Sequence, residues 1–169
     1  MIPKIENILY TTGLGGGTPY VFRYALSLAQ KYDAKIHIIH GHEPLPAGAQ
    51  KVADLYMGNG KAGDVFEKAV VDTEKAIIER LERLCAMETA SDPKGHDRIA
   101  SITVAKLPPK QAILEEAKAR NADLIIMGSH RHSVLADAML GTTTLKVLHI
   151  STIPVMVVRI PDGYHEDGF

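Results

Sequence analysis

The chain has little of what marks a secreted, membrane or nucleic-acid-binding protein. Its 169 residues include one cysteine, Cys85, so no internal disulfide can form and we expect a cytoplasmic, reducing location. A formal net charge of −1 provides no basic surface for nucleic acid or for an anionic membrane. The longest apolar runs are far shorter than the roughly 20 residues that a membrane span requires. No basic region followed by an apolar stretch opens the chain, as it would in a secretory signal.

The motifs of several common enzyme classes are also missing. There is no Gly-x-Ser-x-Gly elbow, no P-loop and no His-Glu-x-x-His pair. We expect at most slow ATP hydrolysis, because no catalytic base or magnesium-binding motif is visible. The balance of 46% hydrophobic and 23% charged residues is that of an ordinary globular protein.

Short apolar runs alternate with amphipathic helical patterns. The runs have the length of strands and lie at 7–12, 35–42, 100–105, 123–128 and 154–159. Helical patterns occupy 18–32, 64–90, 109–121 and about 142–150. Repeated strand–helix–strand order predicts an α/β fold, with an open parallel sheet and helices on both faces.

One domain is expected over residues 1–160, followed by a frayed tail at 161–169. A flexible excursion rich in proline and glycine is predicted at about 43–63, and a polar turn at 91–97. In the last helix, Leu145 and Leu148 are expected to face the core, and Cys85 is expected to pack as a small apolar group.

Loops rich in glycine follow the first and fourth strands, where an open α/β sheet binds its ligands. They are the stretch 12–19, with the letters TGLGGGTP, and Gly128-Ser129. A second small-residue turn, Gly141-Thr142, begins the last helix, whose free N–H groups and hydroxyls could bind an anion. Two plainer interpretations stay open: the glycines serve only the turns, and Thr142 only caps a helix.

The chain resembles the universal stress protein family over nearly its full length. The resemblance is carried by NILYTT at 7–12, by residues 34–44, by VAKLPPKQAILEEAKARNADLIIMGSH at 104–130, and by residues 140–158. It implies a Rossmann-like sheet of five strands in the order 3-2-1-4-5. It also implies a homodimer formed through the last strand, here 154–159, whose edge position invites pairing. Some members bind ATP or AMP, and others lack the motif and do not.

Nucleotide-binding members carry the motif Gly-x2-Gly-x9-Gly-Ser/Thr. Here Gly128 matches its first glycine and Gly141-Thr142 its end, while Arg131 replaces the middle glycine. Arginine loses the backbone freedom of glycine but brings a fixed cation suited to phosphate.

Three further positions depart from the family pattern. Gly13 replaces a common aspartate that touches adenosine, Gly41 replaces a valine that packs near adenine, and Leu107 replaces a glycine. Two hypotheses follow. The first is a stress-response module that binds ATP or AMP, with or without magnesium, or a related phosphate. The second is a dimeric module of the same fold that binds an unknown protein partner and no nucleotide.

The residues expected at the nucleotide or phosphate site share the carboxyl edge of the sheet. They are Thr12, Gly13, Gly41, Met127, Gly128, Ser129, His130, Arg131, Gly141, Thr142, Thr143 and Thr144. Four histidines, His40, His42, His130 and His132, gather at the same edge. We expect no metal there, because no carboxylate or thiolate is spaced as a companion ligand.

Overall fold

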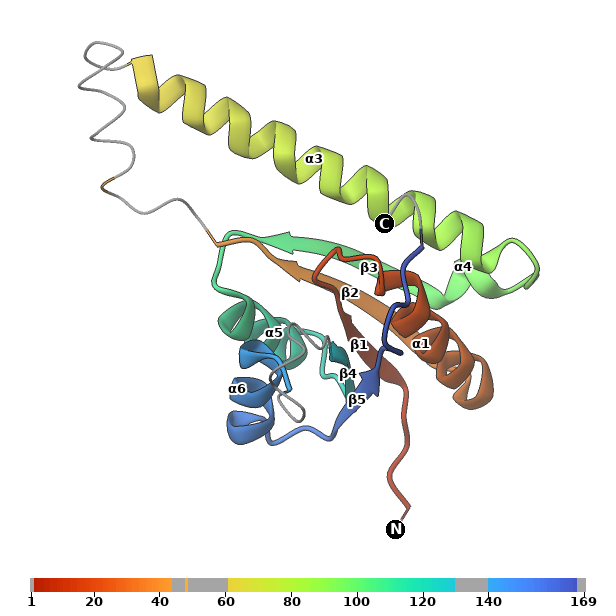
Figure 1. Ribbon diagram of the computed structural model, residues 1–169. Helices are drawn as coiled ribbons and strands as arrows, with labels where there is room; N and C mark the ends of the chain where they lie inside the picture. Colours follow the sequence, from red (N-terminus) through yellow and green to blue (C-terminus); the bar gives the residue numbers. More distant parts are fainter. Residues whose placement is uncertain (1, 44–47, 49–60, 130–139, 167–169) are drawn as a thin grey trace.

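Five parallel strands form one sheet in the order β3-β2-β1-β4-β5 in the computed structural model (Figure 1), which describes residues 2–43, 48, 61–129 and 140–166. The strands are β1 Asn7–Thr11, β2 Lys35–Gly41, β3 Ile99–Ala105, β4 Leu124–Ser129 and β5 Val155–Arg159. Both the α/β class and the strand order predicted from the sequence and the resemblance are confirmed.

The helices cover both faces of the sheet (Figure 1). They are α1 Thr18–Tyr32, α3 Lys61–Thr89, α4 Gly95–Arg98, α5 Pro109–Ala119 and α6 Thr142–Ile150. Helix α3 begins within the excursion expected at about 43–63, so the last three residues of that excursion, 61–63, are helical. The rest of that excursion lies largely outside the described residues. None of the helices in the described part of the chain is long and apolar enough to cross a membrane.

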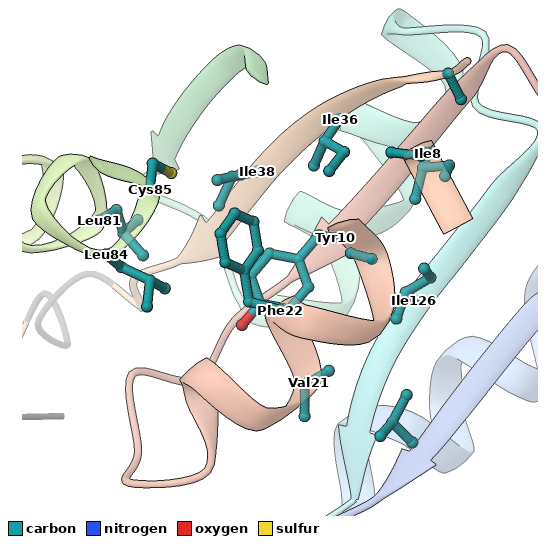
Figure 2. Packing of buried hydrophobic residues seen from close by; sticks show 14 of the residues in the cluster. Ile8, Tyr10, Val21, Phe22, Ile36, Ile38, Leu81, Leu84, Cys85 and Ile126 are labelled. Carbon is teal, nitrogen blue, oxygen red and sulfur yellow. The ribbon is translucent and has the colours of Figure 1, made fainter. Parts of the chain in front are cut away.

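One core lies between the sheet and the helices α1 and α3. Tyr10 of β1 packs against Phe22 of α1, with ring centroids 5.2 Å apart, and both side chains are fully buried (Figure 2). From α3, Leu81 and Leu84 reach the same cluster. Cys85 is buried beside them, and burial raises the pKa of its thiol to about 12. It therefore packs as a small apolar group, as expected.

A second core lies on the opposite face, under α5 and α6. Leu9 of β1 and Ile125 of β4 point to it, because successive side chains of a strand alternate between faces. Helix α6 contributes Val147, which is fully buried. The expectation that Leu148 faces the core is wrong: this side chain is 39% exposed, because the helix presents the neighbouring Val147 to the sheet.

The expected fraying of the tail is wrong for residues 161–166. Tyr164 packs on Tyr20 of α1, with ring centroids 4.9 Å apart. Arg23 of α1 forms an ion pair of 2.6 Å with Glu166. Ring packing and charge pairing therefore hold this segment against α1.

His37 lies buried in β2, on the face of the second core. Its ring nitrogens lie 2.8 Å from Ser101 Oγ and 3.3 Å from Asn7 Oδ1. Burial lowers the pKa of the imidazole, and the charge of Arg120 lowers it further. The folded state therefore favours the neutral ring.

Replacing Leu81 by alanine should lower the free energy of unfolding by about 2–5 kcal/mol, because it removes a fully buried side chain and leaves a cavity. Urea denaturation measures this value. Met87→Ala on the same helix is the control, because Met87 is 68% exposed and its change should stay within about 0.5 kcal/mol. Equal losses in the two variants would contradict the packing described for α3.

The free energy of unfolding should fall as the pH drops below about 6.5, the ordinary pKa of histidine in an unfolded chain. Because the pKa of His37 is lowered by folding, the unfolded state binds more protons below that pH, and stability is full only above it. His37→Gln should reduce the slope of unfolding free energy against pH, by at most about 1.4 kcal/mol per pH unit. Urea titrations between pH 7.5 and 5 measure the slope. A slope that His37→Gln leaves unchanged would contradict this prediction.

Candidate functional site

A cavity of about 290 Å³ opens at the carboxyl ends of β1, β2 and β4. It is lined by Tyr10, Thr11, Thr12, Gly13, Gly17, Thr18, Val21, Ile39, His40, Gly41, Pro109, Ile113, Met127, Gly128, Thr143, Thr144 and Ile160. Sequence reasoning anticipated part of this wall: Thr12, Gly13, Gly41, Met127, Gly128, Thr143 and Thr144. Its volume is close to the lower limit of the range for small-molecule pockets, about 300–1,000 Å³.

Other expected site residues lie beside the cavity or outside the described chain. Ser129 is buried at the end of β4, and its carbonyl accepts a hydrogen bond from the Ile160 N–H at 3.4 Å. Gly141 and Thr142 begin α6 but do not line the cavity. His130 and Arg131 fall in the segment 130–139, outside the described residues.

Sequence reasoning missed the wall residues that come from α1, α5 and the chain after β5. Thr18 and Val21 belong to the first turn of α1, Pro109 begins α5, and Ile160 follows β5. Helices that begin where parallel strands end point their first turns at the same edge of the sheet. The predicted helix starts at 18 and 109 already contained that signal.

Two glycines of the wall permit close packing between elements. A Cβ on Gly41 would lie 2.6 Å from the Pro109 Cα, so any side chain there would push α5 away from β2. A Cβ on Gly128 would lie 2.9 Å from Val21 Cγ2 of α1. Both glycines therefore have a packing role in addition to lining the cavity.

Leu107 does not fill the cavity. Its side chain is partly buried against the second core, with Ala105 and Leu114, and it is not part of the cavity wall. The family glycine that Leu107 replaces is therefore dispensable for an open cavity.

Hydrogen bonds fix the loop between β1 and α1. The Tyr10 hydroxyl donates to the Thr18 carbonyl at 2.9 Å, and the Thr12 and Thr18 hydroxyls lie 3.3 Å apart. The Leu14 N–H donates to Thr12 Oγ1 at 3.1 Å. Leu14 itself has a φ of 60°, a left-handed conformation that is strained for a residue with a branched side chain.

The positive ends of three helices meet at the cavity wall. Gly17 and Thr18 begin α1, Pro109 begins α5, and Thr143 and Thr144 lie in the first turn of α6. Within the described residues no side chain caps these three N-termini, and none of their first turns contains an acidic residue. Their partial positive charge is therefore uncompensated from within the helices, which favours a negatively charged ligand.

His40 is an ionisable member of the wall. Its Nδ1 lies 2.8 Å from the Thr12 carbonyl, an oxygen that can only accept, so Nδ1 carries the proton. Burial lowers the pKa of His40 although this hydrogen bond opposes the shift, and the charge of His42 lowers it further. The ring is therefore favoured in its neutral form, which leaves Nε2 as a hydrogen-bond acceptor.

The described wall does not suit a divalent metal. It contains no aspartate or glutamate, and magnesium takes oxygen ligands from such side chains. No group of three histidine, cysteine, aspartate or glutamate side chains in the described ranges could hold a metal ion. His130 and His132, from the expected histidine cluster, lie outside these ranges.

The model of the universal stress protein family matches residues 4–159. Universal stress protein A homolog 2 of Coxiella burnetii is 32% identical over 138 residues, which are 80% of this chain and 82% of the relative. The solved structure of universal stress protein UspA from Lactobacillus plantarum aligns with a TM-score of 0.65 at 17% identity, over 94% of this chain and all of the other. A universal stress protein solved in complex with cAMP aligns with a TM-score of 0.56 at 19% identity, over 94% and 100% of the two chains.

These matches agree with the observed strand order and extend over nearly all of the sheet and its helices. The chain therefore belongs to the universal stress protein family.

Proposed function

We propose that this protein is a stress-response signalling module that binds an adenine nucleotide, ATP or AMP, or a related phosphate ligand in the cavity. The observation that carries the proposal is the meeting of uncapped helix N-termini, without acidic residues in their first turns, around one cavity. The fold neighbour in complex with cAMP supports the same ligand class.

The chemistry of the wall divides into two parts. Thr143 offers a hydroxyl, and the first turn of α6 offers backbone amides, which suit a phosphate. The Thr144 hydroxyl donates to the Gly128 carbonyl at 3.4 Å, so it positions the turn against β4. Ile39 and Ile113 offer apolar surface, and His40 an acceptor nitrogen, which suit a nucleoside. His130 and Arg131 are included in the proposed site because they lie within the stretch that matches the Gly-x2-Gly-x9-Gly-Ser/Thr motif.

Binding should not depend on magnesium, because the described wall supplies no carboxylate to hold it. The ligand charge would instead be balanced by amides and hydroxyls. This favours ligands with one phosphate over a magnesium-bound triphosphate.

Thr143→Glu should weaken AMP binding by roughly tenfold or more, because it places a carboxylate beside the anion. The same change should preserve or raise stability, since an acidic residue in the first turn of a helix is favourable by about 0.3–1 kcal/mol. Isothermal titration with AMP, ATP and cAMP, with and without EDTA, measures affinity, and urea denaturation measures stability. Mass spectrometry of the freshly purified protein identifies any ligand that remains bound.

Thr142→Glu is the matched control. Thr142 lies in the same helical turn but is exposed and outside the cavity wall, so affinity should fall less while the gain in stability is similar. Absence of co-purified nucleotide, together with no heat of binding for the three probes, would contradict the proposal.

A second function has its own supporting observation, the position of β5 at one edge of the sheet. An unpaired edge strand can pair with a second copy, and the preceding helix exposes Leu148 and Ile150. We propose a homodimer formed through residues 154–159. In the alternative to nucleotide binding, this dimer would act as a module that binds another protein.

Light scattering at micromolar concentration should give twice the mass of one chain. Leu148→Glu combined with Ile150→Glu should shift the protein toward monomer, because charges would enter an apolar contact. Val71→Glu, at an exposed apolar position on α3, should leave the mass unchanged. A monomeric wild type would contradict the dimer.

A further inference from the structure

The chain after β5 packs against the outer side of the glycine loop, defined as residues 13–17. Gly13 and Gly17 of this loop line the cavity. On the other side, the Glu166 N–H donates to the Gly16 carbonyl at 3.2 Å. The glycine loop therefore lies between the cavity and residues 161–166.

The ring of His165 lies against Gly16. A Cβ on Gly16 would lie 2.0 Å from the His165 Nδ1 and 2.7 Å from its Cε1. The ring occupies the space that any side chain at position 16 would need. Gly13 differs, because a Cβ there would meet no atom of the described residues within 4 Å.

Arg23 anchors the same segment to α1. Its guanidinium forms two hydrogen bonds to Glu166, of 2.6 and 3.1 Å, and two to Glu88 of α3, of 2.7 and 2.8 Å. It also donates to the Tyr164 hydroxyl at 3.1 Å. Paired planar hydrogen bonds of this kind fix direction as well as distance, so the segment has a defined position on the helix.

The glycine loop needs such support because it contains a strained residue. Leu14 holds a φ of 60°, a conformation that persists only where surrounding contacts enforce it. The hydrogen bond from Leu14 to Thr12 is one such contact, and the packing of residues 161–166 on Gly16 is another. The loop has no regular secondary structure of its own across 13–15.

We propose that residues 161–166 are a strap that holds the glycine loop in its cavity-lining conformation and so positions the ligand site. The strap lies beyond residues 4–159, which match the family model. Ile160 lies immediately before the strap. It lines the cavity, and its N–H donates a hydrogen bond to the Ser129 carbonyl at the end of β4. The effect of the strap on affinity rests on the proposed nucleotide function, whereas its effect on the loop does not.

Hydrogen exchange of the ligand-free, full-length protein tests the strap directly. Three backbone amides report on the strap. The Leu14 N–H donates to Thr12 Oγ1, the Thr18 N–H donates to the Gly15 carbonyl, and the Glu166 N–H donates to the Gly16 carbonyl. Tyr164→Ala removes the ring that packs on Tyr20 and should speed exchange at all three amides by roughly tenfold. Tyr32→Ala, at a 47% exposed tyrosine of the same helix, is the control and should leave them unchanged.

Gly16→Ala attacks the contact from the loop side. It should speed exchange at the Glu166 and Leu14 amides, because the new methyl displaces the His165 ring. Gly13→Ala is the matched control and should have little effect. Adding His165→Ala to Gly16→Ala should restore slow exchange in part, which is the non-additivity expected of residues in contact.

Exchange that rises at Glu166 but stays unchanged at Leu14 and Thr18 would overturn the strap, since the tail would then move without the loop. Isothermal titration with AMP adds the functional arm, where Tyr164→Ala should weaken binding about fivefold or more if the loop is preorganised by the strap. If the wild type binds no AMP, the nucleotide proposal is contradicted but the strap is not, because hydrogen exchange tests the strap independently.

Discussion

The contact between Tyr10 and α1 determines where the cavity can form. Tyr10 packs on Phe22, and its hydroxyl donates to the Thr18 carbonyl at 2.9 Å. Burial raises the pKa of this phenol, so it stays a neutral donor. Together these contacts fix the start of α1 over the end of β1. The glycine loop must then close a short, defined gap, and its backbone becomes one wall of the cavity.

Packing explains one departure from the family pattern, the glycine at position 41. At position 41 the family commonly has valine, but here the Pro109 backbone lies where that side chain would begin. The first turn of α5 lies against β2, and this helix supplies Pro109 and Ile113 to the wall. The space that a side chain at position 41 would take is therefore filled by α5. At Gly13, by contrast, none of the described residues lies within 4 Å of where a Cβ would be.

The parts that the sequence predicts well are those that depend on local periodicity. The bounds of α1 and α6 coincide with the expected helices, and the apolar runs became the five strands. The tail could not be predicted, because Tyr164 and Glu166 find their partner in Arg23, more than 140 positions earlier. The left-handed Leu14 was equally hidden, since leucine does not signal a positive φ. Tertiary contacts decide both.

A loop that contacts a ligand on one side and a strap on the other couples the two by thermodynamic necessity. Whatever free energy the strap contributes to ordering residues 13–17 is ordering that a ligand no longer has to supply. The reverse also holds, because a ligand that orders the loop must strengthen the strap by the same factor. Arg23 is 46% exposed, so its pair with Glu166 is screened by salt and contributes modestly. Such a weak contact can open without unfolding the core, and this makes the strap suited to communicate ligand binding to the protein surface.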